Sequence, residues 1–344
     1  MPTWRRIRAR DAVEPAPGAG GEDGPVSDEL AGVALTHLDD ELFEGAGATK
    51  RDLVGYLDAV ADRMVPVLSG RPLSVIRVRP GSPPFMQKNL PKYAPEWIAR
   101  TVVWSPASYR EITYALGDDH RTLIWFGNQR AVEYHVTLSR ADDPAPTHLV
   151  IDLDPPEGAP FSAVVATAAL VRQALADTGL AGAVKTSGAK GLHVFVPLLP
   201  GVSWDDAAGA TRALAARAAA LDPGVATPAY IVQDREGKVF VDSTRSGGGT
   251  VAAAYSPRAR PGAPVSFPLG WDDLGSVSPA DFTLHTAVAA LGSGDPWAAA
   301  MPDAVALPED LLEQGRAIPV ARVAAMHEGK RRKRAARTAD GDGS

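Results

Sequence analysis

The segment HLVIDLDPPEG (148–158) places two aspartates in a run that otherwise predicts a buried β-strand. Side chains at positions i and i+2 of a strand point to the same face, so Asp152 and Asp154 share one face. Pro155 and Pro156 end the strand because proline cannot donate a ladder hydrogen bond. Two carboxylates so close together repel each other and favour a divalent cation. The plain alternative is that one of these aspartates only caps the turn that follows.

The composition is that of a globular protein and narrows the possible functions. With 344 residues, 45% of them hydrophobic and 22% charged, the chain can form one large domain or two smaller ones. It has no cysteine, which excludes disulfides and thiolate metal sites. The absence of cysteine fits a reducing cytoplasm, where we expect this protein, and no apolar run approaches membrane-spanning length. The net charge of −6 does not itself indicate a nucleic-acid partner, and a small-molecule enzyme remains an alternative at this point.

The chain divides into three predicted regions. Residues 1–30, rich in glycine, proline and acidic side chains, predict a disordered leader. Residues 31–300 carry the patterns of helices and strands and predict the main folded domain. Residues 301–344 predict a C-terminal helix and a disordered basic tail. Its GKRRKRAAR stretch (329–337) could contact phosphates non-specifically or could be a solvated run of charges.

Hydrophobic periodicity predicts helices and strands that alternate along the main domain. Helices are predicted over 50–68, 161–178 and 205–221, with another ending near Gln129 and one or two beyond Pro279. Strands are predicted at 73–79, 101–104, 109–113, 132–136, 148–154, 183–186, 192–197 and 238–242, and around Tyr255 and Ser256. The strands mostly alternate between apolar and polar residues, so the pattern favours an α+β fold with mixed or antiparallel sheets flanked by helices.

A second polar motif lies in KTSGAKGLHVFV (185–196). Ser187, Lys190 and His193 lie in or beside a glycine-containing turn between two predicted strands. The backbone N–H groups of such a turn, together with an ammonium and a ring nitrogen, can bind a phosphate. The stretch lacks the G-x-x-x-x-G-K-[ST] spacing of a Walker loop. The alternative is an ordinary hairpin turn with an exposed lysine.

A third set of charged residues follows later in the chain. Asp242 ends a predicted strand, as Asp152 and Asp154 do. Three carboxylates converging at strand ends could hold two Mg²⁺ or Mn²⁺ ions, with substrate phosphates completing the coordination. Arg258 and Arg260 follow the strand predicted around Tyr255, and their i, i+2 spacing on a strand edge would suit a polyphosphate. The alternatives are a surface aspartate and two solvated arginines.

Five stretches in a consistent order link these motifs to a known family. They are QKNLPKYAPEW (87–97), WFGNQRAVEYHV (125–136), DLDP (152–155), TSGAKGLHV (186–194) and KVFVD…YSPRAR (238–260). From about residue 35 to residue 274 the chain resembles the archaeo-eukaryotic primase-polymerase superfamily, with closest similarity to the polymerase domain of bacterial ligase D, an enzyme of non-homologous end joining. The resemblance implies a primase-polymerase catalytic core over 31–300. It also implies a template-directed nucleotidyltransferase that extends primer 3′ ends with NTPs or dNTPs in DNA repair.

The resemblance assigns roles to individual residues. The carboxylates implied to coordinate two Mn²⁺ or Mg²⁺ ions are Asp152, Asp154 and Asp242. The residues implied to hold the triphosphate are Ser187, Lys190, His193 and Arg258, with His135 reaching the same pocket or the sugar. The residues implied to contact DNA are Phe85, Lys50, Lys88 and Arg235. Without the resemblance, His135 would be taken for a core histidine and Arg235 for a solvated loop residue.

The implied partners are nucleoside triphosphates and primer–template DNA with ends or gaps. We expect a cytoplasmic, nucleoid-associated protein with no membrane contact. The sequence contains no K-x-D-G nucleotidyl-lysine motif, so we expect a stand-alone polymerase. It would rely on a separate ATP-dependent DNA ligase and a Ku-like end-binding protein. Two other hypotheses remain open: a non-catalytic end-bridging paralogue that binds nucleic acid, and a metal-dependent hydrolase that uses the same carboxylates.

Three departures from the family pattern concern contacts to DNA. Where the family usually has a lysine that binds the 5′-phosphate of a downstream strand, this chain has Asp40, which leaves Lys50 as the nearest matching cation. Met86 replaces the second of two adjacent aromatic residues, and the loop at 246–249 is short and lacks an expected lysine. We therefore expect weak recognition of 5′-phosphates beside intact chemistry.

Overall fold

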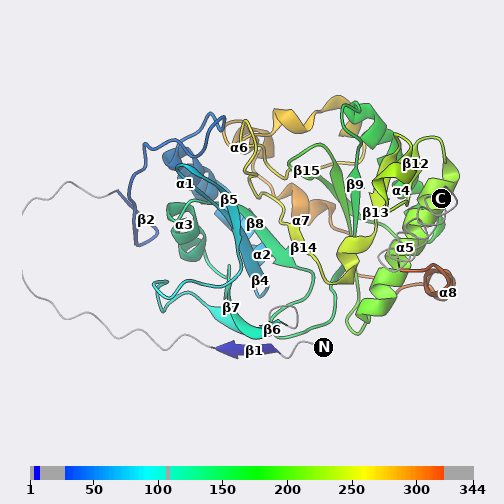
Figure 1. Cartoon of the computed structure of the whole chain (residues 1–344), viewed down its shortest axis with the longest axis horizontal. Helices are drawn as coiled ribbons and strands as arrows, with labels where there is room; N and C mark the ends of the chain where they lie inside the picture. Colours follow the sequence, from blue (N-terminus) through cyan, green and yellow to red (C-terminus); the bar gives the residue numbers. More distant parts are fainter. Residues whose placement is uncertain (1–3, 8–27, 106–108, 321–344) are drawn as a thin grey trace, which may run out of the picture. The chain divides into compact units, whose positions relative to one another are not determined.

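The structure is a computed structural model that describes residues 4–7, 28–105 and 109–320 (Figure 1). Most of the predicted leader and the basic tail lie outside the described residues. The chain divides into two compact units. Unit 1 comprises 1–147, 183–189 and 248–300, and unit 2 comprises 148–182, 190–247 and 301–344. The predicted main domain over 31–300 therefore contains parts of two units, and the predicted boundary after residue 300 is where the chain returns to unit 2.

Unit 1 contains an antiparallel sheet with the order β1-β6-β7-β4-β8-β14, in which β5 also pairs with β4. Its strands are β1 (Trp4–Ile7), β4 (Pro72–Arg79), β5 (Ser82–Gln87), β6 (Arg100–Ser105), β7 (Arg110–Leu116), β8 (Ala131–Thr137) and β14 (Thr250–Ala252). The short elements of the unit are β2 (Glu29–Leu30), β3 (Val33–Ala34), β10 (Ala183–Thr186), β15 (Pro268–Leu269), α6 (Ala287–Leu291) and α7 (Pro296–Ala300). The prediction of disorder over 1–30 is thus wrong for β1, whose backbone pairs with β6, and for β2.

Three helices of unit 1 pack against one another, and α3 also contacts β8. They are α1 (Lys50–Ala59), α2 (Ala61–Leu68) and α3 (His120–Asn128). The α1 helix begins at residue 50 because Thr49 and Asp52 form a capping box, in which each side chain accepts a hydrogen bond from the other residue's backbone N–H. The single helix predicted over 50–68 is two helices, because Val60 (φ −105°, ψ 2°) leaves helical geometry between them.

The segment after β14 corrects another prediction. No strand contains Tyr255 and Ser256, because Tyr255 has a φ of +68°, a left-handed conformation that ends an extended chain. The Tyr255 hydroxyl hydrogen bonds the Asp295 carboxylate, and its backbone N–H donates to the Ser266 carbonyl (2.8 Å). Arg258 and Arg260 therefore follow a turn and are not i, i+2 neighbours on a strand edge.

Unit 2 contains a mixed sheet with the order β12-β13-β9-β11, in which only β12 and β13 are parallel. Its elements are β9 (His148–Asp154), α4 (Phe161–Asp177), β11 (Leu192–Pro197), α5 (Trp204–Leu221), β12 (Ala226–Thr227), β13 (Val239–Asp242) and α8 (Glu309–Ala317). Both α4 and α5 pack on β9 and β13, and α8 packs on α5 (Figure 1). Short 3₁₀ helices occur in unit 2 at Val232–Arg235 and Thr244–Gly247, and in unit 1 at Leu274–Ser276 and Pro279–Asp281.

The predicted α+β class with antiparallel and mixed sheets is confirmed. Beyond Pro279 the described residues form three helices, α6, α7 and α8, where one or two were predicted. In the part of the chain that the structure describes, no helix combines the length and the apolar character needed to span a membrane.

Candidate active site

Asp152 lies at the centre of a row of polar side chains in the unit 2 sheet. On β9 it is the register partner of His193 on β11 and of Asp242 on β13. Directly opposite residues of antiparallel strands share a face, so these three side chains lie side by side on one face. Asp154, two residues further along β9, points to the same face and is exposed. The sheet register thus gathers the carboxylates that the sequence singled out, together with one of the predicted phosphate ligands.

The Asp152 carboxyl is buried, with 7% of the residue exposed. One oxygen, Oδ2, accepts hydrogen bonds from Nε and Nη2 of Arg245 at 3.3 and 3.2 Å. The other, Oδ1, lies 3.5 Å from Nε2 of His193. Burial, together with the negative charges of Asp154 and Asp242, raises the pKa of Asp152 to about 6, although the charge of Arg245 lowers it.

Arg245 is a site residue that the sequence analysis missed. It lies in the 3₁₀ helix at Thr244–Gly247, directly after β13. The Thr244 backbone N–H donates to Oδ1 of Asp242 (2.7 Å), and the Ser246 hydroxyl accepts a hydrogen bond from the Val150 backbone N–H on β9 (2.9 Å). These contacts fold the turn back onto the sheet and place the guanidinium beside Asp152. The sequence feature that could have identified Arg245 is its position three residues after Asp242, the aspartate that ends a predicted strand.

The carboxylate oxygens in this row are the kind of ligand that a hard divalent cation such as Mg²⁺ or Mn²⁺ prefers. The buried Asp152 carboxyl, whose pKa is raised by two neighbouring carboxylates, is a group that a cation would stabilise in its charged form. Among the described residues, however, no three or more His, Asp or Glu side chains form a group arranged to hold a metal ion. The type of ligand atom thus suits the expected ions, whereas the arrangement of the described side chains does not by itself form a metal site, and Arg245 supplies positive charge to the row.

A second cluster lies in unit 1 and centres on Glu133, another residue that the sequence analysis missed. Its carboxylate accepts hydrogen bonds from Nε2 of His135 (2.8 Å), Nε of Arg258 (2.9 Å) and the backbone N–H of Ala259 (3.0 Å). Arg258 also donates through Nη1 to the backbone carbonyl of Ser187. Three predicted nucleotide ligands, His135, Arg258 and Ser187, are thus brought together. The sequence feature that could have identified Glu133 is its position two residues before His135, since residues at this spacing share one face of a strand.

The remaining predicted phosphate ligands belong to unit 2. Lys190 is exposed in the turn before β11, whereas His193 is buried beside Asp152. Gly191 allows this turn to approach β9 closely, because a Cβ atom there would lie 2.0 Å from the Leu153 carbonyl oxygen. The glycine of the predicted phosphate turn thus has a packing role in this sheet.

The predicted DNA-contacting residues lie in different surroundings. Phe85 on β5 is half-buried under the Arg79 guanidinium, 4.7 Å from the ring centroid, and Lys88 is exposed. They line a cavity of about 320 Å³ formed by Phe85, Met86, Gln87, Lys88, Asn89, Arg110 and Ile112. Arg235 in unit 2 lies over the Phe240 ring at 3.9 Å and donates to the Ala229 carbonyl. An aromatic ring flanked by exposed cations is typical of a surface for single-stranded nucleic acid.

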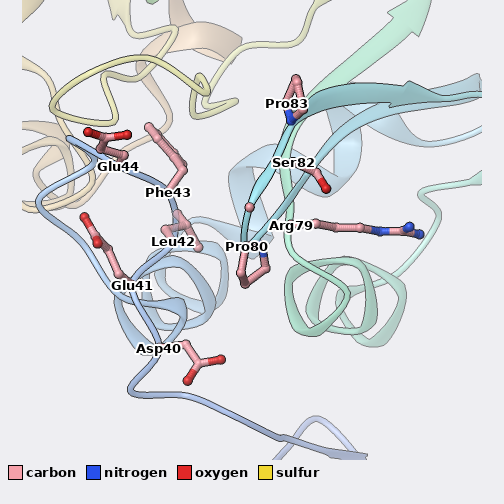
Figure 2. A pocket seen from close by; sticks show the side chains of 10 residues that line it. Asp40, Glu41, Leu42, Phe43, Glu44, Arg79, Pro80, Ser82 and Pro83 are labelled. Carbon is pink, nitrogen blue, oxygen red and sulfur yellow. The ribbon is translucent and has the colours of Figure 1, made fainter.

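Lys50 and Asp40 are held inside a local network. The Lys50 ammonium is buried and donates to the Thr36 carbonyl, and burial and the nearby Arg130 charge lower its pKa to about 8. Asp40 forms an ion pair with Arg130, with 2.6 Å between Oδ2 and Nη2. Asp40 also lines a cavity of about 760 Å³ between the 40–44 loop and the turn after β4, where Glu41 and Glu44 add further carboxylates (Figure 2). Arg130 thus offsets the charge of Asp40, a pairing that no local sequence pattern predicts.

Three comparisons with known proteins bear on this arrangement. Residues 49–297 match the family model described as LigD, primase-polymerase domain. The chain is 37% identical over 254 residues to the multifunctional non-homologous end joining DNA repair protein LigD of Mycobacterium tuberculosis, covering 70% of this chain and 33% of that protein. It is 32% identical over 259 residues to the bifunctional non-homologous end joining protein LigD of Bacillus subtilis, covering 74% of this chain and 41% of that protein.

A solved structure is also similar. The polymerase domain from Mycobacterium tuberculosis ligase D, in complex with DNA, superposes with a TM-score of 0.70 at 32% sequence identity, covering 78% of this chain and 99% of that domain. The chain spans well under half the length of the curated relatives it matches, whereas it covers nearly all of the solved domain. Because the family model matches well over half of its length, the chain belongs to the family of LigD primase-polymerase domains.

Proposed function

We propose that this protein is a template-directed nucleotidyltransferase that extends primer 3′ ends with NTPs or dNTPs in DNA repair such as non-homologous end joining. The observation that carries the proposal is the row of Asp152, Asp242 and His193 on one face of the unit 2 sheet, with Asp154 beside it. Polymerising nucleotides requires carboxylates that hold divalent cations against a triphosphate, and this row has that composition.

The proposed cofactors are two Mn²⁺ or Mg²⁺ ions held by Asp152, Asp154 and Asp242. When bound there, such ions would activate the primer 3′-hydroxyl and offset the charge that develops on the pyrophosphate leaving group. His193 and Arg245 orient the buried Asp152 carboxylate, because both contact its oxygens. Arg245 also offsets the mutual repulsion of the three carboxylates.

The proposed nucleotide ligands supply donors for the triphosphate. They are Ser187, Lys190, His193, Arg258 and His135. Arginine and lysine stabilise phosphoryl oxygens through charge-assisted hydrogen bonds, and a neutral or charged imidazole can add another donor. The proposed DNA contacts are Phe85, Lys88, Arg235 and Lys50, of which Lys50 would have to release its hydrogen bond to the Thr36 carbonyl before its buried ammonium could reach DNA. The similarity to a polymerase domain solved in complex with DNA supports DNA as the partner. A separate ATP-dependent ligase and a Ku-like protein remain proposed partners.

Primer extension tests the proposal. The wild-type protein should extend a labelled primer on overhang, gapped or blunt DNA with NTPs or dNTPs and Mn²⁺, and Asp152→Ala should abolish extension because it removes the central carboxylate. Glu157→Ala is the matched control, since Glu157 is an exposed carboxylate three residues beyond Asp154. Absence of extension by the wild type on all three substrates would refute the proposal.

The non-catalytic end-bridging protein is the second candidate. It is favoured by the observation that, among the described residues, no group of three potential ligands is arranged for a metal ion. A protein of this kind would bind DNA ends in a mobility-shift assay but would not extend primers. The same Asp152→Ala variant would then bind DNA as the wild type does, with no activity to lose.

A further inference from the structure

Glu133 on β8 is a buried carboxylate whose oxygens are both hydrogen bonded. Only 4% of the residue is exposed. Oε2 accepts from Nε2 of His135 and Nε of Arg258, while Oε1 accepts from the backbone N–H of Ala259. Burial by itself would raise its pKa, but the hydrogen bond from His135 and the charge of Arg258 outweigh burial and lower the pKa to about 2. The carboxylate is therefore ionised at any working pH.

The hydrogen bonds to Glu133 use only one nitrogen of His135 and one of Arg258. Glu133 engages Nε2 of His135 and Nε of Arg258, and the Nη1 group of Arg258 donates to the Ser187 carbonyl. Among the residues that the structure describes, Nδ1 of His135 and Nη2 of Arg258 make no hydrogen bond. The His135 and Arg258 side chains are 12% and 15% exposed, so both are largely buried but still reach solvent.

Packing restricts Arg258 further. Gly188, in the turn after Ser187, has a φ of +68°, and a Cβ atom there would lie 2.5 Å from Cγ of Arg258. The turn and the arginine are therefore in close contact, and the Arg258 side chain is confined between Glu133 and residues 187–188. A guanidinium held in this way loses less conformational freedom when it binds an anion than a free surface arginine does.

We propose that Glu133 is a positioning residue that holds His135 and Arg258 in the orientation that binds the phosphates of the incoming nucleotide. The inference rests on the proposed function, because the ligand it names is a nucleoside triphosphate. Glu133 touches no substrate in this scheme. Its hydrogen bonds fix both side chains while Nη2 of Arg258 and Nδ1 of His135, within the described part of the chain, stay free for a ligand, and preorganised donors of this kind bind a polyanion more tightly than mobile ones.

The test compares Glu133→Gln with the wild type in nucleotide binding and in steady-state primer extension. Glutamine keeps the size of the side chain but removes its charge and turns an amide N–H₂ toward the donors of His135 or Arg258. We expect the KM for ATP or dATP with Mn²⁺ to rise by about tenfold or more, while kcat changes by less than about threefold, because ground-state binding of the triphosphate is what is lost. Binding of mant-ATP should weaken by a similar factor.

Two further variants separate positioning from folding. Glu111→Gln is the matched control, since Glu111 is an exposed carboxylate on β7 of the same sheet, and it should leave KM unchanged. Glu133→Asp keeps the charge on a shorter side chain and should recover part of the affinity lost in Glu133→Gln. If Glu133→Gln does not fold, the KM of Glu133→Asp carries the test, and an unaltered KM would contradict the proposal.

The outcomes distinguish this inference from the proposed function. If the wild type binds mant-ATP and extends primers, and Glu133→Gln shows the same KM with only a lower melting temperature, Glu133 has a structural role and the inference is wrong. If the wild type neither binds mant-ATP nor extends primers, the proposed function itself fails. A selective rise in KM with kcat nearly retained, partly reversed by aspartate, supports positioning.

Discussion

Asp152 on β9 and Asp242 on β13 are register partners in neighbouring antiparallel strands, so their carboxylates lie on the same face of the unit 2 sheet. Two ionised groups in this position repel each other, and Asp152 is also buried. The fold therefore maintains an unfavourable arrangement of charge at this point, as functional sites commonly do. Arg245 on the following turn relieves part of the repulsion.

Replacing Asp152 by asparagine should stabilise the protein while abolishing its activity. The pKa of Asp152 is raised to about 6, so between its unfolded value of 3.8 and 6 the folded state binds more protons and loses stability as the pH rises. At pH 7.5 Asp152→Asn removes that cost, and we expect a gain of about 1–3 kcal/mol. Urea unfolding at pH 7.5 and at pH 4 measures it. The gain should shrink at pH 4, and a variant less stable than the wild type at pH 7.5 would contradict the prediction.

Replacing Arg245 by glutamine should raise the pKa of Asp152 above about 6, because the guanidinium charge now lowers that pKa. Carboxyl ¹³C NMR titration of the metal-free protein, with Asp152→Asn to assign the resonance, measures the change directly. Arg316→Gln on α8 is the control, since Arg316 is an exposed arginine of the same unit that pairs with Asp206 and Glu309. An Asp152 titration that is identical in Arg245→Gln and the wild type would show that the ion pair does not form in solution.

Asp40→Asn should create a preference for DNA gaps with a 5′-phosphate. In the wild type the Asp40 carboxylate accepts a hydrogen bond from Nη2 of Arg130, and Asp40, Glu41 and Glu44 all line the same cavity, so we expect a preference below about threefold (Figure 2). The amide leaves Arg130 without its carboxylate partner, and the preference should rise to about tenfold. Fluorescence anisotropy with 5′-phosphorylated and 5′-hydroxyl gaps measures the ratio.

Asp39→Asn provides the control for this comparison, because it changes the net charge equally at a neighbouring carboxylate that pairs with Arg51 instead. The ratio should stay at its wild-type value in Asp39→Asn. A large wild-type preference that Lys50→Ala abolishes would show that Asp40 does not weaken phosphate recognition.

Lys50 should make the protein more stable as the pH rises from about 8. Burial and the Arg130 charge lower its pKa from 10.5 to about 8, so between these values the unfolded state binds more protons than the folded state. Stability therefore increases with pH across this window, in addition to any other titrations. Urea midpoints at pH 7.5 and 9.5 should show that Lys50→Met loses this increment. An equal increase in both proteins would place the Lys50 pKa at its ordinary value.

Gly315→Ala should disrupt the packing of α8 on α5, whereas Gly209→Ala should not. A Cβ atom at Gly315 would lie 2.3 Å from the Gly209 backbone, but a Cβ atom at Gly209 would lie 3.5 Å from the Gly315 backbone, which is ordinary contact. We expect Gly315→Ala to cost about 1–3 kcal/mol. Gly209→Ala should be neutral or gain up to about 1 kcal/mol in helix propensity. Urea denaturation of both variants checks the difference, and equal effects would contradict the asymmetry.

Local patterns were sufficient to predict most elements. The alternation in 73–79 and the run ending in Asp154 correspond to β4 and β9, and α4 and α5 lie within one or two residues of their predicted bounds. Prediction failed where tertiary contacts override local preference. Tyr255 takes a left-handed conformation in which its hydroxyl reaches Asp295, and Trp4–Ile7 becomes a strand because β6 offers it a partner.

The sequence by itself determined the α+β class and the positions of Asp152, Asp154 and Asp242 at strand ends, because strand periodicity and proline placement are local properties. Only the tertiary structure decided which side chains meet. The register that aligns Asp152 with Asp242 and His193 depends on strands far apart in the chain. The contacts of Arg245, Glu133 and Arg130 likewise follow from packing, since a lone arginine or glutamate has no local pattern that names its partner.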